Sequence, residues 1–444
     1  TLRFVLASLN INLEDEEDEE DEEIDEEISY SLEKILESAN DWNLSRSRFW
    51  GIPLPIWRTE DGKEAVCIGS VEQLKNALEL SVQAGFMVKN PLADFKLNDF
   101  SAENYLQFDL HKPYVDDWIL VSESGKPMRR EADLIDVWFD SGSMPYAQLH
   151  YPFENKSLVD DRKAFPADFI AEGVDQTRGW FYTLHAIATA CFDSVAYKNV
   201  VSNGLVLDKN GNKMSKRLGN AVDPFITLSK YGPDATRWYM LTNAQPWDNL
   251  KFDEEGITET QRKLFGTLSN TYQFFVIYAN IDHYEYDENG VSLENRSELD
   301  RWIISRLNSL IQFVDQHLSD FDPTPAARAI DEFVDVHLSN WYVRLSRKRF
   351  WHGEMSQDKK AAYQTLHECM TVVSQLISPF APFYADWLYR QLTQRKEGDS
   401  VHLSHWPKVN TAYIDVQLEQ NMDWAQRISS MVLSIRKKEN IKVR

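Results

Sequence analysis

The sequence predicts a mixed α/β domain that is followed by an all-α helical bundle. From Trp42 to about Gly256, short apolar runs alternate with amphipathic stretches and Gly/Pro turns, which is typical of α/β structure. Beyond about Leu264, apolar residues recur at helical spacing instead. Ahead of both parts, the run Glu14–Glu27 holds 13 acidic residues in 14 positions. Such a run repels itself and buries nothing, so it does not belong to either core.

These differences in composition predict three segments. We expect an acidic segment at 1–40 that is disordered or non-native, an α/β domain at 41–256 and a helical domain at 257–444. Within the first segment, Ile28–Ala39 places apolar residues on one helical face and predicts a helix. The acidic run supplies more than half of the net charge of -23. The total charge therefore does not exclude a polyanionic partner that binds a local basic patch.

The elements of the α/β segment can be placed from their turns. Three short strands are predicted, at Asp168–Ile170, Asn199–Val201 and Gly204–Leu207. The last of them ends in a turn of Asp, Lys, Asn and Gly. A helix is predicted near Gln176, and Pro224 and Pro233 each stand at the first position of a further helix.

The helical segment shows three apolar stripes and the start of a fourth helix. The first stripe is Ile303, Leu307, Leu310, Ile311, Val314 and Leu318. The second is Ile330, Phe333, Val334, Leu338, Trp341 and Leu345. The third is Leu366, Met370, Val373 and Ile377, and Pro379 and Pro382 mark the turn that follows. This spacing predicts an antiparallel helical bundle.

Nothing in the sequence predicts membrane insertion or a metal centre. The longest apolar stretches, such as Leu184–Ala190, are far shorter than the roughly 20 residues of a membrane span. No secretory signal opens the chain, so we expect a cytoplasmic location. Cys67, Cys191 and Cys369 have no partner at ligand spacing. They predict reduced structural side chains and no protein-bound zinc.

The segment Lys213-Met214-Ser215-Lys216-Arg217 follows a predicted strand and a turn. Two lysines three residues apart, between glycines, form a cationic loop that can close over a triphosphate. Ammonium groups there stabilise charge that develops on the phosphates in the transition state. By composition alone, however, a basic turn is usually a solvated surface feature.

The stretch NGLVLDKNGNKMSKRLGN (203–220) resembles the KMSKS loop of class I aminoacyl-tRNA synthetases. The last residue of the signature differs, since Arg217 stands where the family has serine. The resemblance implies that the loop binds ATP and that Lys216 contacts the nucleotide. It also implies a partial Rossmann-like catalytic domain followed by an anticodon-binding bundle.

Three further segments resemble isoleucyl-tRNA synthetases. They are NDWNLSRSRFWGIPLPIW (40–57), DLIDVWFDSGSMPYAQ (133–148) and PADFIAEGVDQTRGWFYTL (166–184). In the first, Asn43 and Phe49-Trp50-Gly51 favour the isoleucyl family over the valyl family, which is expected to show a cysteine-containing tract and Trp-Trp-Gly. The resemblance implies ATP-dependent activation of L-isoleucine and transfer to tRNA(Ile). It implies Mg2+ on the phosphates, no covalent enzyme nucleophile and a monomer.

The third of these segments has a physical interpretation of its own. Glu172, Gly173, Asp175 and Gln176 lie at the carboxyl end of a predicted strand and the start of a helix, where ligands bind in open α/β sheets. Carboxylates there can accept an ammonium group and ribose hydroxyls, and the resemblance implies that these four residues bind isoleucyl-adenylate. The alternative for Asp175 and Gln176 is a helix cap.

Two tryptophans, Trp138 and Trp180, resemble the aromatic walls of the isoleucine pocket in this family. An apolar slot separates isoleucine from valine by only about 1–3 kcal/mol for one methylene, so such an enzyme also needs editing. Taken singly, either tryptophan is more typical of ordinary core packing.

In the helical segment, NWYVRLSRKRFW (340–351) interleaves cations with aromatic residues. Such a pattern can neutralise phosphates and stack on unpaired bases. The candidate tRNA-binding residues are Trp341, Arg344, Arg347, Lys348 and Arg349. A helix whose last turn carries cations that complement its dipole is the alternative, and some of these arginines can pack against the catalytic domain instead.

The histidine-containing HIGH-like tetrapeptide of class I synthetases does not occur in these 444 residues. The sequence likewise contains no segment that resembles the first half of the nucleotide-binding fold or the editing insertion of the family. We therefore expect this chain by itself to form no isoleucyl-adenylate at a normal rate. The alternatives are a fragment with valyl or leucyl specificity and a non-catalytic tRNA-binding fragment.

Overall fold

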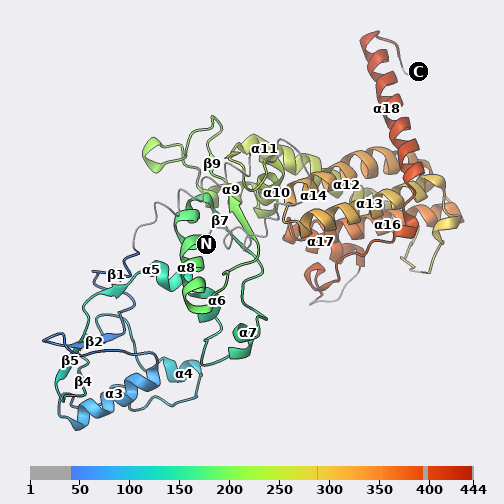
Figure 1. Cartoon of the computed structure of the whole chain (residues 1–444). Coiled ribbons are helices and arrows are strands. Elements are labelled where there is room, and N and C mark those ends of the chain that lie inside the picture. The colour runs from blue at the N-terminus through green and yellow to red at the C-terminus, as the bar shows by residue number, and fades with distance from the viewer. Residues whose placement is uncertain (1–41, 288, 352, 394–398, 443–444) are drawn as a thin grey trace. The chain divides into compact units, whose positions relative to one another are not determined.

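The computed structural model describes residues 42–442 except 288, 352 and 394–398 (Figure 1). The acidic segment and the helix predicted at Ile28–Ala39 lie outside the described residues. The chain divides into two compact units, Thr1–Val200 and Val201–Arg444. Strand β8 (Val200–Asn203) lies at the division.

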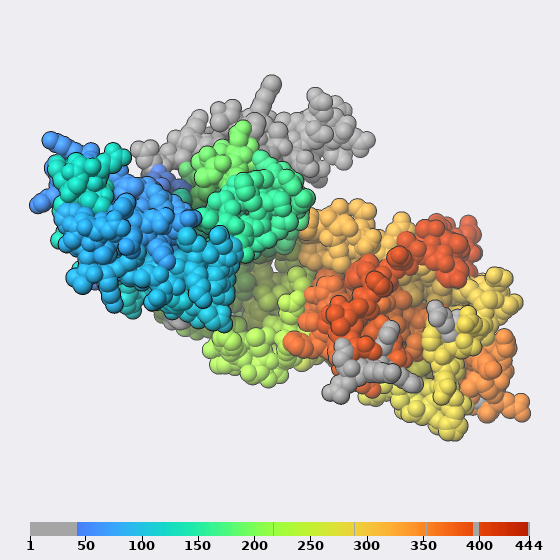
Figure 2. All heavy atoms as spheres, turned by 90° about the horizontal axis from the view of Figure 1, so that it is seen from below, coloured from blue at the N-terminus to red at the C-terminus, as the bar shows by residue number. Residues whose placement is uncertain are grey.

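The first unit contains a small antiparallel subdomain at residues 56–130. Its four strands have the order β3-β2-β5-β4, and they are β2 (Ile56–Thr59), β3 (Ala65–Cys67), β4 (Leu120–Val121) and β5 (Pro127–Arg130). In the register, Trp57 pairs with Val66 on one side and with Arg130 on the other. Helix α3 (Val71–Gln83) buries Leu74 and Leu78 in the same core as Trp57. Figure 2 shows this subdomain, in blue, as one body.

The remainder of the first unit carries the predicted ligand-binding segments. Strands β1 (Ser45–Arg46) and β6 (Leu134–Ile135) pair antiparallel. The other elements are α5 (Val137–Gly142), α6 (Met144–Ala147), α7 (Lys156–Asp160), β7 (Ile170–Gly173), the 3-10 turn η1 (Val174–Arg178) and α8 (Trp180–Phe192), while the short helix α4 (Ala102–Tyr105) belongs to the subdomain at 56–130. Phe165, Ile170, Phe181 and Leu184 are buried together in their core. The strand predicted at Asp168–Ile170 thus exists, two residues later in the chain.

The second unit begins with two short parallel strands and two helices. Strand β9 (Val206–Leu207) pairs with β10 (Leu250–Lys251). Helices α9 (Pro224–Tyr231) and α10 (Pro233–Asn243) start at the two prolines, as the sequence predicts. Proline is favoured there because its fixed φ fits a helix and its missing N–H would have no partner in the first turn.

After β10 the described residues contain helices and no further strand. They are α11 (Glu254–Thr260), α12 (Thr267–Ile281), α13 (Glu298–Ser319), α14 (Pro323–Glu332), α15 (Arg344–Trp351), α16 (Gln357–Leu376), α17 (Pro382–Thr393) and α18 (Val416–Lys438), with short 3-10 turns at Leu293–Asn295, Val401–Leu403 and Thr411–Tyr413. Two π-helical stretches, η3 (Gln261–Gly266) and η5 (Phe333–Val343), continue α11 and α14. Helical turns therefore run through the boundary predicted between residues 256 and 257. None of the described helices has the length and hydropathy that a membrane crossing requires.

One hydrophobic core joins these helices, and the predicted stripes lie in it. Every member of the first and third stripes is buried except Leu318, which packs against the core from its margin. The second stripe is correct as far as Trp341, but Leu345 is 52% exposed. The π-helical turns of η5 explain the difference, because i→i+5 bonding shifts the register of the residues that follow.

Candidate functional site

The carboxyl end of β7 leads through a single turn into α8. Ile170 fixes the strand, since it is buried and its N–H donates to the carbonyl of Asn199 (3.0 Å). At the strand end, Glu172 and Asp175 are exposed, and Gly173 between them is half-buried. A Cβ at Gly173 would lie 2.6 Å from Asp175 Oδ1. With glycine at position 173, the Asp175 carboxylate can lie directly against the strand end, and a larger residue would require the side chain of Asp175 to shift.

Gln176 connects this acidic end to the helix. Its Oε1 accepts from the backbone N–H of Trp180 (3.0 Å), and its Nε2 donates to Asp175 Oδ2 (3.2 Å). The amide oxygen thus caps the first turn of α8, which is the alternative that the sequence left open for this residue. The second bond, from Gln176 Nε2, orients the Asp175 carboxylate beside Gly173.

The two predicted tryptophans both lie near the start of α8. Trp180 is half-buried and its Nε1 donates to the carbonyl of Ser141 (3.0 Å). Trp138 is 40% exposed, and its ring lies 3.6 Å from the position of a Cβ on Gly179. Helix α5 can approach α8 closely because Gly142 faces Thr183, where a Cβ would meet backbone atoms at 3.1 Å. The first unit therefore brings Trp138, Trp180 and the 172–176 segment into one neighbourhood.

A buried carboxylate behind Trp138 was not predicted from the sequence. Asp136 accepts hydrogen bonds from Trp42 Nε1 (2.9 Å), Arg46 Nη2 (2.7 Å) and the backbone N–H of Trp138 (3.3 Å). It is buried and caps α5. An Asp directly before a helix was a visible signal, but the partners lie about 90 residues earlier in the chain. The ion pair between Arg46 and Asp136 holds the segment 42–46 against the N-terminus of α5.

A hollow of about 530 Å³ opens beside this ion pair. Arg46, Asp136 and Trp138 line it together with Trp50, whose ring stacks on His111 at 4.8 Å between centroids. Aromatic faces and charged groups thus surround one space that is large enough for a small organic ligand.

The cationic loop lies in the second unit. After β9, the chain turns at Gly211 (φ +87), and Lys213 returns to pair with Leu207. Met214 packs against the small core around Tyr239 and Ile257. The side chains of Lys213 and Arg217 are exposed and Ser215 is half-buried. The side chain of Lys216 lies outside the described part of the chain, although its backbone opens the 3-10 turn Lys216–Leu218. That this loop faces the 172–176 segment across a cleft stays a prediction.

Helix α15 carries the predicted tRNA-binding residues. Arg344, Arg347 and Lys348 are exposed, and Trp341, just before the helix, is half-buried against the core. Arg349 differs from the other three cations, because only 14% of its side chain is exposed. The structure thus separates an exposed set of three from one inward-facing arginine.

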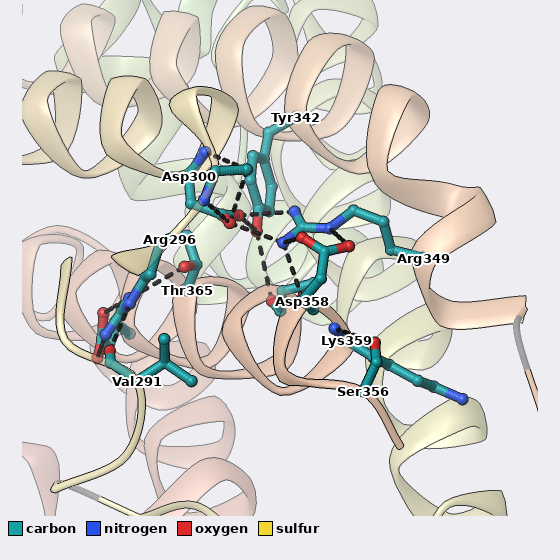
Figure 3. A network of polar contacts seen from close by, with 12 residues as sticks. Val291, Arg296, Asp300, Tyr342, Arg349, Ser356, Asp358, Lys359 and Thr365 are labelled. Carbon is teal, nitrogen blue, oxygen red and sulfur yellow. Dashed lines mark hydrogen bonds and ion pairs between the residues drawn. The ribbon is translucent and has the colours of Figure 1, made fainter. Parts of the chain in front are cut away.

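Arg349 belongs to a polar network inside the bundle (Figure 3). Its guanidinium donates to both carboxylate oxygens of Asp300 (2.8 and 2.7 Å) and to Asp358 (2.9 Å). Asp300 is fully buried and also accepts from the hydroxyl of Tyr342 (2.6 Å) and from Ser297. Burial raises the pKa of Tyr342 well above its ordinary value, and the neighbouring Asp300 adds to the rise. Arg349 therefore joins the ends of α13, α15 and α16.

A second ion pair extends the network along α16. Arg296 donates to Glu368 with both terminal nitrogens (2.7 and 2.9 Å) and to Thr365 (3.0 Å). Burial disfavours its charge, but the bonds to Glu368 outweigh burial and raise the pKa of Arg296. Such bidentate pairs fix helix orientation more strictly than a single contact does.

Family models match the chain in two places. Residues 22–253, over half of the chain, match the tRNA synthetases of class I (I, L, M and V). Residues 300–444 match the anticodon-binding domain of tRNA ligases. The two matches follow each other in the order that the sequence predicts.

The chain is also similar to curated proteins named isoleucine–tRNA ligase. It is 62% identical to that of Bacteroides thetaiotaomicron over 416 residues, which are 93% of this chain and 36% of the relative. It is 62% identical to that of Porphyromonas gingivalis and 46% identical to that of Clostridium tetani, over 93% of the chain in each case and 36% and 37% of the relatives. The chain thus spans little more than a third of the length of these relatives.

Solved structures support the fold. The LeuRS of Agrobacterium radiobacter K84, in a ternary complex with tRNA and LeuAMS, matches with a TM-score of 0.60 at 19% identity over 87% of this chain and 45% of that one. The methionyl-tRNA synthetase of Mycobacterium tuberculosis with methionyl-adenylate matches with a TM-score of 0.51 at 18% identity over 67% of this chain and 55% of that one. With the family match over more than half of its residues, the chain belongs to the class I tRNA synthetases of the isoleucine, leucine, methionine and valine group.

Proposed function

We propose that this chain acts in an isoleucine–tRNA ligase, which activates L-isoleucine with ATP and transfers it to tRNA(Ile). The observation that carries the proposal is the neighbourhood of two exposed carboxylates and two tryptophans at the start of α8. A carboxylate is suited to the ammonium group of an amino acid, and aromatic walls are suited to a branched apolar side chain. The 62% identity to proteins named isoleucine–tRNA ligase supports the choice of isoleucine.

In the proposed first step, the isoleucine carboxylate attacks the α-phosphorus of ATP, and pyrophosphate leaves. Glu172 and Asp175 hold the amino group and the ribose, Gly173 lets the backbone approach the adenylate, and Gln176 fixes Asp175 through the observed hydrogen bond. Lys213 and Lys216 offset the charge that develops on the phosphates. Mg2+ bound with the nucleotide would supply further positive charge at the same oxygens.

In the proposed second step, a terminal ribose hydroxyl of the tRNA attacks the adenylate carbonyl, and AMP leaves. Positioning and electrostatics suffice for both steps, so no enzyme nucleophile is required. Trp138 and Trp180 would select the side chain by shape. The domain division at residues 41–256 and 257–444, the monomeric state and the cytoplasmic location belong to the same proposal.

The test of this proposal is amino-acid-dependent ATP–pyrophosphate exchange by a full-length synthetase that carries this sequence. Isoleucine should be preferred over valine by about 10–200-fold in kcat/KM, the range that one methylene allows, and leucine should be excluded by its branching. A preference for valine or leucine would reassign the specificity. Exchange with none of the three amino acids would remove the proposed activity.

The exposed cations of α15 are proposed to contact tRNA. Replacing Arg344 and Arg347 together by alanine should weaken binding of tRNA(Ile) to this chain by about tenfold and lower the salt slope by about 1–2, since two phosphate contacts are lost. Filter binding at several salt concentrations measures both quantities. Arg301→Ala, an exposed arginine on α13, is the matched control. If wild type, the double variant and Arg301→Ala bind with equal affinities and salt slopes, these cations do not contact tRNA and only complement the helix dipole.

A further inference from the structure

We propose that Asp208 and Asn220 form a clasp that positions the cationic loop 213–217 for the nucleotide. These two residues close the two ends of the loop, and they lie within the stretch 203–220 but outside the five signature residues 213–217. The proposal deepens the proposed function, on which it rests. Its evidence is the set of hydrogen bonds that both side chains make within the second unit.

Asp208 organises the first end of the loop. Its Oδ1 accepts from the backbone N–H groups of Asn210 and Asn212, both at 2.9 Å. The backbone N–H of Asp208 itself donates to the carbonyl of Asn212 (2.9 Å), and that of Gly211 donates to the carbonyl of Asp208 (2.9 Å). These bonds alone would describe an ordinary Asx-type turn. They occupy Oδ1, while Oδ2 accepts only a long bond from the side-chain amide of Asn212 within the turn (3.4 Å) and can accept a shorter one from farther along the chain.

Asn220 supplies that partner from the other end of the loop. Its Nδ2 donates to Asp208 Oδ2 at 2.9 Å, across 12 residues of sequence, and lies 3.3 Å from the carbonyl of Lys213. Its Oδ1 accepts from the backbone N–H of Ser215 (2.9 Å). One amide thus holds the backbone on both sides of Met214 and ties it to Asp208.

The clasp divides the loop into a held part and a free part. Met214 is held a second time by the core around Tyr239. Arg217, Leu218 and Gly219 are exposed, and Gly219 (φ +66) has no atom within 4 Å of a Cβ position. The backbone N–H of Leu218 still donates to the carbonyl of Ser215 (3.2 Å), so residues 216–219 form a 3-10 turn that is joined to the held part at Ser215 and can pivot at Gly219.

The charge state suits a permanent rather than a switchable contact. Hydrogen bonds from Asn220 and from the backbone of Asn212 lower the pKa of Asp208 to about 2. Asp208 therefore stays ionised at physiological pH, where its bond to the amide of Asn220 is stronger than a bond between neutral groups. Without the clasp, more conformational freedom would be lost when the loop orders over a triphosphate.

The first test is limited trypsin digestion of the 444-residue chain. Mass spectrometry measures the rate of cleavage after the basic residues of the loop, which are Lys209, Lys213, Lys216 and Arg217. Asn220→Ala should raise the cleavage rate in the loop several-fold, because the held part is released. Asn210→Ala is the matched control, since only the backbone of Asn210 takes part in the turn. Equal loop cleavage in wild type and Asn220→Ala would overturn the proposal, whatever the activity of the protein.

The second test uses pyrophosphate exchange by the full-length synthetase. Asn220→Ala should lower kcat/KM for ATP by about tenfold, as expected for the loss of a hydrogen bond to a charged group, and leave KM for isoleucine unchanged. A general folding defect would change the kinetic constants for both ATP and isoleucine. An unchanged kcat/KM for ATP would also overturn the proposal.

An exchange of the two side chains tests the contact itself. Asp208→Asn removes the carboxylate, and Asn220→Asp places two carboxylates face to face, so each variant alone should lose activity toward ATP. The double variant Asp208→Asn/Asn220→Asp keeps the net charge and restores one donor opposite one carboxylate, but a carboxylate at position 220 cannot donate to the carbonyl of Lys213 as Asn220 does. The double variant should therefore recover part of the loss. An activity no higher than that of either single variant would contradict a direct contact. Inactivity of the wild type with every amino acid would instead remove the proposed function, and the digestion would still decide the clasp.

Discussion

Lys216→Ala is expected to slow isoleucine-dependent ATP–pyrophosphate exchange by about 10²–10³-fold, the usual cost of removing one preorganised group that stabilises transition-state charge. The reason is that the second lysine of the loop 213–217 is proposed to contact the phosphates as pyrophosphate leaves. The loss should appear mainly in kcat, because this contact is strongest in the transition state. Steady-state exchange with ATP and isoleucine varied separately measures it in a full-length synthetase that carries this sequence.

Lys209→Ala is the control for this variant. Lys209 is an exposed lysine in the turn that precedes the signature, and it has the same charge but no proposed role. Its exchange rate should stay within about twofold of wild type. If Lys216→Ala loses no more activity than Lys209→Ala, the loop does not act on the phosphates.

Arg349→Met is expected to lower the free energy of unfolding of the helical unit by about 3–5 kcal/mol, the typical cost of removing one partner of a buried ion pair. Asp300 would keep its bonds to Tyr342 and Ser297 but lose both bonds from the guanidinium. Since Asp300 is fully buried, water could not replace them. Urea unfolding followed by circular dichroism measures the change.

Arg347→Met provides the matched comparison, because it makes the same substitution at an exposed position of the same helix. Its unfolding free energy should change by less than about 0.5 kcal/mol. The double variant Asp300→Leu/Arg349→Met should recover part of the loss, since no unpaired charge remains buried. Equal losses at positions 347 and 349 would contradict a structural role for the network in Figure 3.

The fold could be predicted from the sequence wherever an apolar pattern repeats over several helical turns or a proline marks the start of a helix. The apolar stripes along α13 and α16 repeat over several turns, and Pro224 and Pro233 are the first residues of α9 and α10. The antiparallel sheet at 56–130 was not predicted, because its strands have only two to four residues and show no sustained alternation. The exposure of Leu345 was missed because a π-helical stretch leaves no mark in apolar spacing.

From residue spacing alone, the candidate site could be predicted only where its residues are close in sequence, and Trp138 was added to it by the family resemblance. Residues 172–176 share one strand end, so their grouping follows from a single turn. The ion pair of Arg46 with Asp136 and that of Arg349 with Asp300 join residues about 90 and 49 positions apart. Local patterns carry no information about such contacts. Arg349 therefore looked like the exposed cations beside it, although its side chain faces the bundle interior.

The central claim is that the acidic strand end at 172–176 and the cationic loop at 213–217 bind the same adenylate. A crystal structure of a full-length synthetase carrying this sequence, with a non-hydrolysable isoleucyl-adenylate analogue, tests it most directly. We predict that the amino group and ribose lie within hydrogen-bond distance of Glu172 or Asp175, that the side chain lies between Trp138 and Trp180, and that the loop covers the phosphate position. An analogue bound elsewhere, or a loop on a face that has no access to the ligand, would contradict the account.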